Sequence, residues 1–119
     1  WNVLAAAPSV DEGVVTWLAI DPHGVLGEPA YEVGTLLRNP LPWLLAGGER
    51  RARAVSARRI AILAEALGVE RRRVTGWAAA NAVLSAWWSV EDHGAGWEGA
   101  IGVAEVLFGL LRDGEGAEL

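Results

Sequence analysis

The sequence contains no cysteine and no lysine among its 119 residues. Without cysteine, the chain can build neither a disulfide framework nor a thiolate metal site. Because all ten basic residues are arginine, a lysine nucleophile, a lysine Schiff base and a phosphate-binding lysine are excluded as well. No apolar run approaches the roughly 20 residues of a membrane-spanning helix, since Gly, Glu or Arg interrupts each one, and we expect no membrane partner.

The chain is acidic, with a formal net charge of −5 and an isoelectric point of about 4.9. Such a chain is a poor default binder of nucleic acid and a better host for cationic small molecules. The arginine-rich stretches "RRARAVSARR" and "ERRRV" are the opposing observation. Arg50, Arg51, Arg58 and Arg59 fall opposite an apolar stripe, where solvated residues belong, so we expect no nucleic-acid partner.

The length fits one domain or part of one, and 52% of the residues are hydrophobic. That fraction lies at the upper edge for a soluble domain and indicates surface that something else covers. The sequence starts at Trp1, inside an apparent strand, and shows no signal peptide. We therefore expect a piece of a larger cytoplasmic protein, whose exposed apolar surface meets an absent N-terminal lobe or a second copy.

The order of elements predicts a mainly α fold with one β-hairpin. Residues 1–21 form strand, turn and strand, and Pro and Gly then mark an irregular loop. Helices are expected over residues 29–39, 40–49 (a short one), 49–68, 69–94 and 97–114, with the helical part spanning 29–112 and a frayed tail at 113–119. Because a lone hairpin is only marginally stable, we expect it to lie on the helices.

Helical periodicity predicts which faces are buried. The third helix should bury Val55, Ile60, Leu63, Ala64 and Leu67 and end at Gly68. The fourth is apolar on most sides and should be central, with Trp77, Asn81, Leu84 and Trp88 on one face and Ala80, Val83, Trp87 and Val90 on the next. We assign Trp77 and Trp87 to the core. The fifth should bury Ile101, Ala104, Phe108 and Leu111, with Gly102 and Gly109 permitting close packing.

Asp21 ends the second predicted strand and precedes the turn "PHG". It either caps that turn or serves as a metal ligand, since a carboxylate at a strand tip can bind Mg²⁺ bridged to phosphates. Asn2 begins the first strand, and strand pairing would bring it near Asp21. Protein kinases use an Asn and an Asp in this way for two Mg²⁺ ions. His23, in the turn, is expected to face solvent, and a contact with phosphate is the alternative.

Several blocks in the same order resemble the aminoglycoside phosphotransferase family, within its streptomycin 6-kinase and hydroxyurea phosphotransferase group. "NVL" at residues 2–4 is similar to the end of the family's catalytic loop, and "IDP" at residues 20–22 to its second metal-binding motif. "GEPAYEVGTLLRNP" resembles its Gly-Asp-Pro-x-Tyr-Asp-Leu-Ala segment, with Glu28 and Glu32 in place of aspartates. A later block, "AILAEALGVERRRVTGWAAANAVLSAWWSVED", is similar to this group as well.

The resemblance implies the C-terminal lobe of a protein-kinase-like fold and transfer of the ATP γ-phosphate to an aminoglycoside hydroxyl or to hydroxyurea. It implies that Asn2 and Asp21 hold Mg²⁺ and that Glu32 accepts hydrogen bonds from the catalytic loop; a plain first-turn glutamate is the alternative for Glu32. In the kinase pattern the catalytic Asp precedes the metal-binding Asn by five positions, which falls before Trp1. By itself the chain should then be inactive, and a non-catalytic packing module is the alternative.

The segment "WWSVEDHG" is the strongest candidate for substrate binding. Glu91 and Asp92 crowd the end of a predicted helix, where the helix dipole disfavours anions. This placement indicates either plain solvation or a cationic partner. Carboxylates bind guanidinium groups bidentately, and streptomycin-like substrates carry such groups, so we interpret Glu91, Asp92 and the neighbouring Trp88 as a site for a cationic antibiotic.

Overall fold

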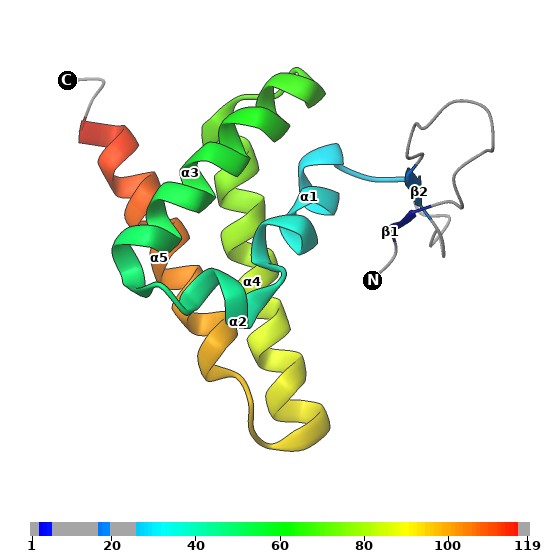
Figure 1. Cartoon of the computed structure of the whole chain (residues 1–119), viewed down its shortest axis with the longest axis vertical. Coiled ribbons are helices and arrows are strands. Elements are labelled where there is room, and N and C mark those ends of the chain that lie inside the picture. The colour runs from blue at the N-terminus through cyan, green and yellow to red at the C-terminus, as the bar shows by residue number, and fades with distance from the viewer. Residues whose placement is uncertain (1–2, 6–16, 20–25, 117–119) are drawn as a thin grey trace.

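A computed structural model of the chain describes residues 3–5, 17–19 and 26–116 (Figure 1). The elements are β1 (Val3–Ala5), β2 (Trp17–Ala19), α1 (Pro29–Arg38), α2 (Leu41–Leu45), α3 (Gly48–Leu67), α4 (Arg71–His93) and α5 (Glu98–Gly116). This order confirms the prediction of one hairpin followed by a mainly helical part. Helix α5 extends to Gly116, into the segment 113–119 where we expect a frayed tail, and residues 117–119 lie outside the described part.

Local sequence features set the helix ends, and α3 ends at Gly68 as predicted. Pro29 opens α1, where its missing N–H costs nothing, and Glu28 caps this helix by accepting a hydrogen bond from the Ala30 N–H at 3.4 Å. Gly68 ends α3 with φ of 63°, a left-handed conformation that glycine adopts without steric cost. Gly94 ends α4 in the same way, with φ of 66°.

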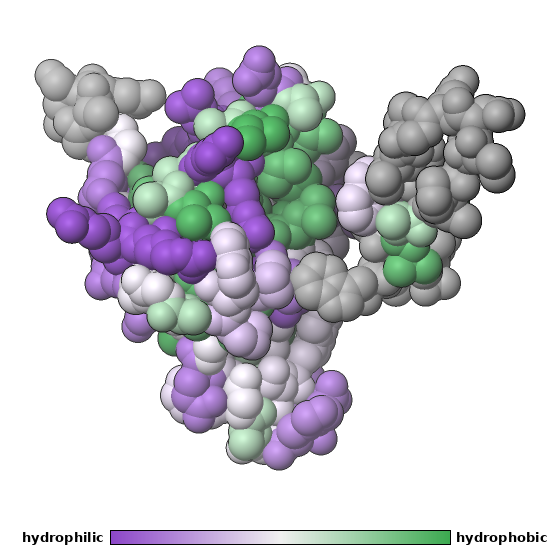
Figure 2. Space-filling view, viewed as in Figure 1, coloured by the Kyte–Doolittle hydropathy of each residue, from purple (hydrophilic) through white to green (hydrophobic). Residues whose placement is uncertain are grey.

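Helix α4 is the centre of the bundle and packs against both α1 and α5 (Figure 1). Its buried face consists mostly of alanine, which lets the neighbouring backbones approach closely. The core cluster comprises Ala30, Val33, Leu37, Leu44, Ile60, Ala64, Val74, Ala78, Ala79, Ala82, Val103, Ala104 and Leu107. Figure 2 shows hydrophilic residues gathered over α3, on the outside of this core.

The aromatic side chains of α4 do not belong to the core, and the assignment of Trp77 and Trp87 to it is wrong. Their exposed fractions are 37% and 58%. The small side chains of α4 face its neighbours, so the indoles are left on the other side. The edge of Trp77 instead meets the ring of Tyr31 on α1, with centroids 5.8 Å apart and the rings perpendicular.

The predicted buried stripes of α3 and α5 are correct only in part. On α3, Ile60 and Ala64 are buried, whereas Leu67 is 39% exposed. On α5, Ala104 is buried but Phe108 is 45% exposed. The residues that α5 buries besides Ala104 are Ala100, Val103, Val106 and Leu107. The buried face of α5 is thus made of small and branched side chains, and the aromatic ring of Phe108 lies off that face.

Two arginines of α3 are not solvated in the way we predicted. Arg51 donates a hydrogen bond to the carbonyl oxygen of Trp43 at 2.7 Å, and its guanidinium carbon lies 4.1 Å from the centroid of the Trp43 ring. Arg59 donates to the carbonyl oxygen of Asn39 at 2.8 Å. Together they hold α2 and the connection that precedes it against α3.

The two strands pair antiparallel, with Val3 opposite Ala19 and Ala5 opposite Trp17. The expectation that the hairpin lies on the helices is wrong for the described residues. Leu4, Trp17 and Leu18 are 48%, 66% and 50% exposed, and Figure 1 shows the strands apart from the bundle. The helices form their core by packing against one another, so this core does not require the described strands. No described helix is long and apolar enough to cross a membrane.

Helices α1 and α4 approach most closely where Gly34 meets Asn81. A Cβ placed on Gly34 would lie 2.7 Å from the Cβ of Asn81 and 2.9 Å from its Cγ. Asn81 is only 6% exposed and belongs to the buried face of α4, so it has no room to move aside.

Gly34→Ala should therefore destabilise the fold by about 1–3 kcal/mol, because the added methyl group forces the two helices apart. The measurement is the free energy of unfolding by denaturant. Gly102→Ala on α5 is the matched control: its Cβ would lie 3.6 Å from the nearest atom, an ordinary contact. This control should be neutral or stabilising by about 0.5–1 kcal/mol. Equal stability of the Gly34 variant and the unsubstituted chain would contradict the close contact.

Candidate functional site

The proposed metal ligands, Asn2 and Asp21, lie outside the described residues, but the hairpin beside them can be examined. Asn2 immediately precedes Val3, Asp21 follows Ala19 by two residues, and Val3 and Ala19 are partners in the ladder. The assignment of Asn2 and Asp21 as metal ligands stays a prediction. Amide and carboxylate oxygens are suitable ligands for Mg²⁺. No group of three or more acidic or histidine side chains that could hold a metal occurs within residues 3–5, 17–19 and 26–116.

An ion pair joins the start of α1 to the first turn of α4. The Nη2 of Arg73 donates to the Oε2 of Glu28 at 2.6 Å, and the same carboxylate caps α1. The hydrogen bond from Arg73 lowers the pKa of Glu28 below its ordinary value of 4.5, and the Arg73 pKa rises in turn. Because Glu28 follows the segment that carries Asp21, the pair fixes where the chain enters α1.

Glu32 lies in the first turn of α1, and its side chain is exposed. It has no hydrogen-bond or ion-pair partner among the described residues. A first-turn glutamate is favoured there by the helix dipole in any case. The role that the resemblance implies for Glu32, as an acceptor for the catalytic loop, remains a prediction.

The three residues predicted to bind substrate are grouped at the end of α4. Trp88 is 48% exposed, and Glu91 and Asp92 are exposed as well. At about 1.5 Å of rise per residue, Asp92 lies about 28 Å along the helix from Arg73. The structure therefore brings these three side chains to one helix end but does not bring them to the ion pair at the other end.

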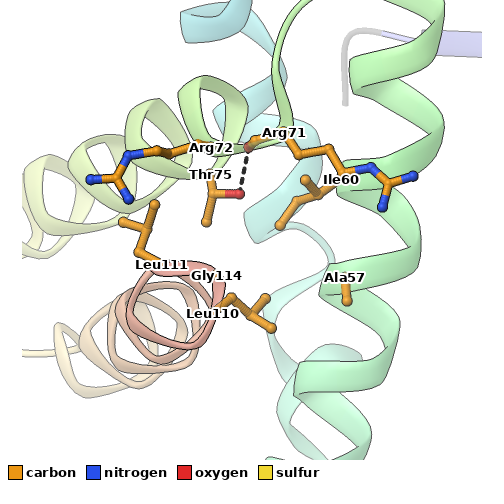
Figure 3. Close-up of a pocket in the computed structure, with 8 residues that line it drawn as sticks. All are labelled: Ala57, Ile60, Arg71, Arg72, Thr75, Leu110, Leu111 and Gly114. Atoms are coloured by element: carbon orange, nitrogen blue, oxygen red, sulfur yellow. Dashed lines mark hydrogen bonds between the residues drawn. The ribbon is translucent and has the colours of Figure 1, made fainter. Parts of the chain in front are cut away.

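A cavity of about 290 Å³ lies where α3, the start of α4 and the end of α5 meet. It is lined by Ala57, Ile60, Arg71, Arg72, Thr75, Leu110, Leu111 and Gly114 (Figure 3). The Thr75 hydroxyl donates to the Arg71 carbonyl oxygen at 2.7 Å, within its own helix. Figure 3 shows the guanidinium groups of Arg71 and Arg72 pointing away from each other, so they do not converge on one anion. The cavity contains none of the predicted site residues.

The sequence-based reasoning missed the pair formed by Glu28 and Arg73. Glu28 was noted only as a replacement for an aspartate, and Arg73 only as part of an arginine-rich stretch. The pattern that could have indicated a role for Glu28 is an acidic residue directly before Pro29, the usual arrangement of a cap before a proline at the first helical position. Nothing local points to Arg73, which is 45 positions away.

Comparison with known proteins identifies the family. Residues 2–93 match the family described as aminoglycoside/hydroxyurea antibiotic resistance kinase. This match covers more than half of the chain and includes the hairpin and α1–α4, so the chain belongs to this family.

Three curated relatives illustrate the range of the similarity. The chain is 33% identical over 109 residues to a streptomycin 6-kinase of Streptomyces glaucescens, covering 91% of this chain and 33% of that protein. It is 36% identical over 94 residues to a hydroxyurea phosphotransferase of Kitasatospora aureofaciens, covering 78% and 25%. It is 34% identical over 89 residues to a streptomycin 3''-kinase of Klebsiella pneumoniae, covering 70% and 31%. The chain thus spans a quarter to a third of these relatives, and no solved structure matches it.

The lowered pKa of Glu28 predicts how one mutation depends on pH. In Arg73→Gln the carboxylate loses its partner, so the variant should be less stable than the unsubstituted chain near neutral pH. The stabilisation requires ionised Glu28; it is complete above the ordinary pKa of 4.5 and is lost as the pH falls through the lowered folded-state value. The difference in unfolding free energy, measured by denaturant titration at several pH values, should shrink below that pH. Arg71→Gln is the control, and a pH-independent difference for Arg73→Gln would argue against the pair.

Proposed function

We propose that the polypeptide containing these residues transfers the γ-phosphate of ATP to a hydroxyl of a streptomycin-like aminoglycoside or to hydroxyurea. The observation that carries this proposal is the family match over residues 2–93. The curated relatives in both kinase groups support it. The described residues would then form part of the C-terminal lobe of a kinase-like fold. Inactivation of an antibiotic is the corresponding biological role.

In this proposal Asn2 and Asp21 hold Mg²⁺, which neutralises charge on the nucleotide phosphates when it is bound. The pairing of β1 with β2 is compatible with the assignment, because Val3 pairs with Ala19, Asn2 directly precedes Val3 in the sequence, and Asp21 follows Ala19 by two positions. The ion pair of Glu28 and Arg73 holds the start of α1 against α4. Catalysis would come from positioning and from neutralised charge, as in other phosphoryl transfers, with the acceptor hydroxyl oriented by residues upstream of Trp1.

The acidic end of α4 is the proposed site for cationic groups of the substrate. Glu91 and Asp92 are exposed, so their carboxylates are open to a guanidinium group, and the half-exposed ring of Trp88 supplies a wall. Their distance from the ion pair of Glu28 and Arg73 means that they would bind a part of the substrate remote from the anchored start of α1.

Asp21→Asn should lower phosphate transfer from Mg²⁺–ATP to streptomycin by about 10²-fold or more, because a catalytic metal supplies several kcal/mol of transition-state stabilisation. The assay uses the complete polypeptide that its gene encodes and measures kcat with ADP release. Asp113→Asn, which changes an exposed carboxylate paired with Arg53 on α3, is the matched control and should retain the rate. Undiminished turnover of the Asp21 variant would remove Asp21 from the metal site.

The double variant Glu91→Gln, Asp92→Asn should raise the KM for streptomycin by about 10-fold or more, since each charge-assisted hydrogen bond contributes roughly 1.5–3 kcal/mol. Hydroxyurea, which carries no guanidinium group, should show little change in KM. Glu98→Gln, at the exposed start of α5, is the control. An unchanged KM for streptomycin would exclude the end of α4 from substrate binding and leave the metal assignment intact.

A further inference from the structure

Helix α4 carries a regular apolar stripe on the side opposite its alanine-rich buried face. The stripe consists of Trp77, Ala80, Leu84 and Trp87, with alternating spacings of three and four residues, as in the seam of a coiled coil. Trp77 and Trp87 are 37% and 58% exposed, Ala80 is exposed, and Leu84 is half-buried. The packing of α1 and α5 accounts for the buried alanine face of α4, whereas on the stripe Trp77 contacts Tyr31 of α1 and remains partly exposed, and Trp87 is more than half exposed.

Opposite charges end the stripe. Arg73 lies four residues before Trp77, and Glu91 lies four residues after Trp87, so both continue the same line along the helix. The side chain of Arg73 is 58% exposed even with Glu28 bound, and Glu91 is exposed. We call the stripe together with its two charged ends the seam. Along α4 its side chains are a cation, an indole, an alanine, a leucine, an indole and an anion, and its midpoint falls between Ala80 and Leu84.

This order of side chains is complementary to the same order in a second, antiparallel copy of the helix. If two copies of α4 pack antiparallel about a two-fold axis at the midpoint, Arg73 faces Glu91 of the second copy, and Trp77 faces Trp87 of the second copy. Ala80 faces Leu84 of the second copy, so a small side chain meets a large one at the centre. A two-fold interface requires this kind of self-complementary surface. A parallel arrangement would instead place each charge opposite its own kind.

The exposed indoles supply a large part of the area that such an interface needs. An indole side chain buries up to about 250 Å², so Trp77, Trp87 and the neighbouring Trp88 together expose on the order of 350 Å². Val83 and Val90, which are 42% and 44% exposed, flank the stripe and extend it. A standard interface needs about 800 Å² from each partner, and the three indoles alone approach half of that.

We propose that this chain forms an antiparallel homodimer through the α4 seam of Arg73, Trp77, Ala80, Leu84, Trp87 and Glu91. The contact of Trp77 with Tyr31 fixes one indole before association, which lowers the entropy cost of binding. The proposal is independent of the phosphotransferase activity. It gives Glu91 a guanidinium partner from the second copy, whereas the substrate proposal gives it a guanidinium partner from the antibiotic.

The first test measures the oligomeric state of the 119-residue chain by light scattering at micromolar concentrations. The expected mass is twice that of the 12.6-kDa chain. Trp87→Glu should weaken the dimer by at least about 30-fold, as for a buried interface tryptophan. Ile62→Glu on α3 is the matched control, because Ile62 is 56% exposed and lies off the seam, and this variant should stay dimeric. Circular dichroism of each variant verifies that the helices are retained.

The second test determines the orientation of the two copies. Because the chain has no cysteine, single cysteines can be introduced without background. A mixture of Arg73→Cys and Glu91→Cys chains should form a disulfide between copies under mild oxidation. Neither variant alone should do so, since in the antiparallel dimer identical end positions lie about 27 Å apart along the helix.

Three outcomes would overturn the proposal. A monomer at these concentrations would show that another part of a longer polypeptide, or nothing, covers the seam. Equal weakening by Trp87→Glu and Ile62→Glu would place the interface elsewhere. Disulfides formed by Arg73→Cys alone would require a parallel arrangement.

Discussion

The close contact of α1 with α4 is the constraint on which the remaining packing depends. Gly34 allows the α1 backbone to approach Asn81 so closely that no side chain fits between them. Because α1 packs at this position, the alanine-rich face of α4 is buried, and the indoles on the opposite face of the helix are exposed. Close packing of small residues contributes many weak dispersion contacts, which are lost when the spacing increases even slightly. The position of α1 also determines where Glu28 lies.

The sequence predicted the helices well and their buried faces poorly, and both results have physical reasons. Helix ends depend on nearby residues, such as Pro29 and Gly68, whose backbone preferences act locally. The buried face of α4 cannot be found in that way, because this helix is apolar nearly all round and its periodicity does not select one side. Side-chain volume determines which face of α4 is buried, because alanines pack into a tight interface and indoles such as that of Trp87 do not fit. Predicting burial from hydrophobicity alone therefore failed where volume mattered.

In the candidate site too, local motifs could be found from the sequence, whereas contacts between distant residues could not. Asn2 and Asp21 were found through motifs, and the motifs identified the family correctly. The register of the hairpin, by contrast, could not have been deduced from residue spacing across a long turn. The ion pair of Glu28 and Arg73 could not be predicted, because its partners are 45 positions apart and only the packing of α1 on α4 brings them together. Contacts between distant segments follow from the fold rather than from local pattern.

Arg73 belongs both to the ion pair with Glu28 and to the seam of α4 proposed as the dimer interface. Its guanidinium group is planar, carries five donors and uses only part of them on Glu28, so a second carboxylate can bind on its exposed side. In the antiparallel dimer that carboxylate is Glu91 of the second copy. A guanidinium between two carboxylates loses less side-chain entropy for the second bond than for the first, since it is already held. Association through α4 would then strengthen the anchor at Glu28, and by reciprocity of linked equilibria the anchor would favour association. One arginine thereby couples the surface of α4 to the start of α1.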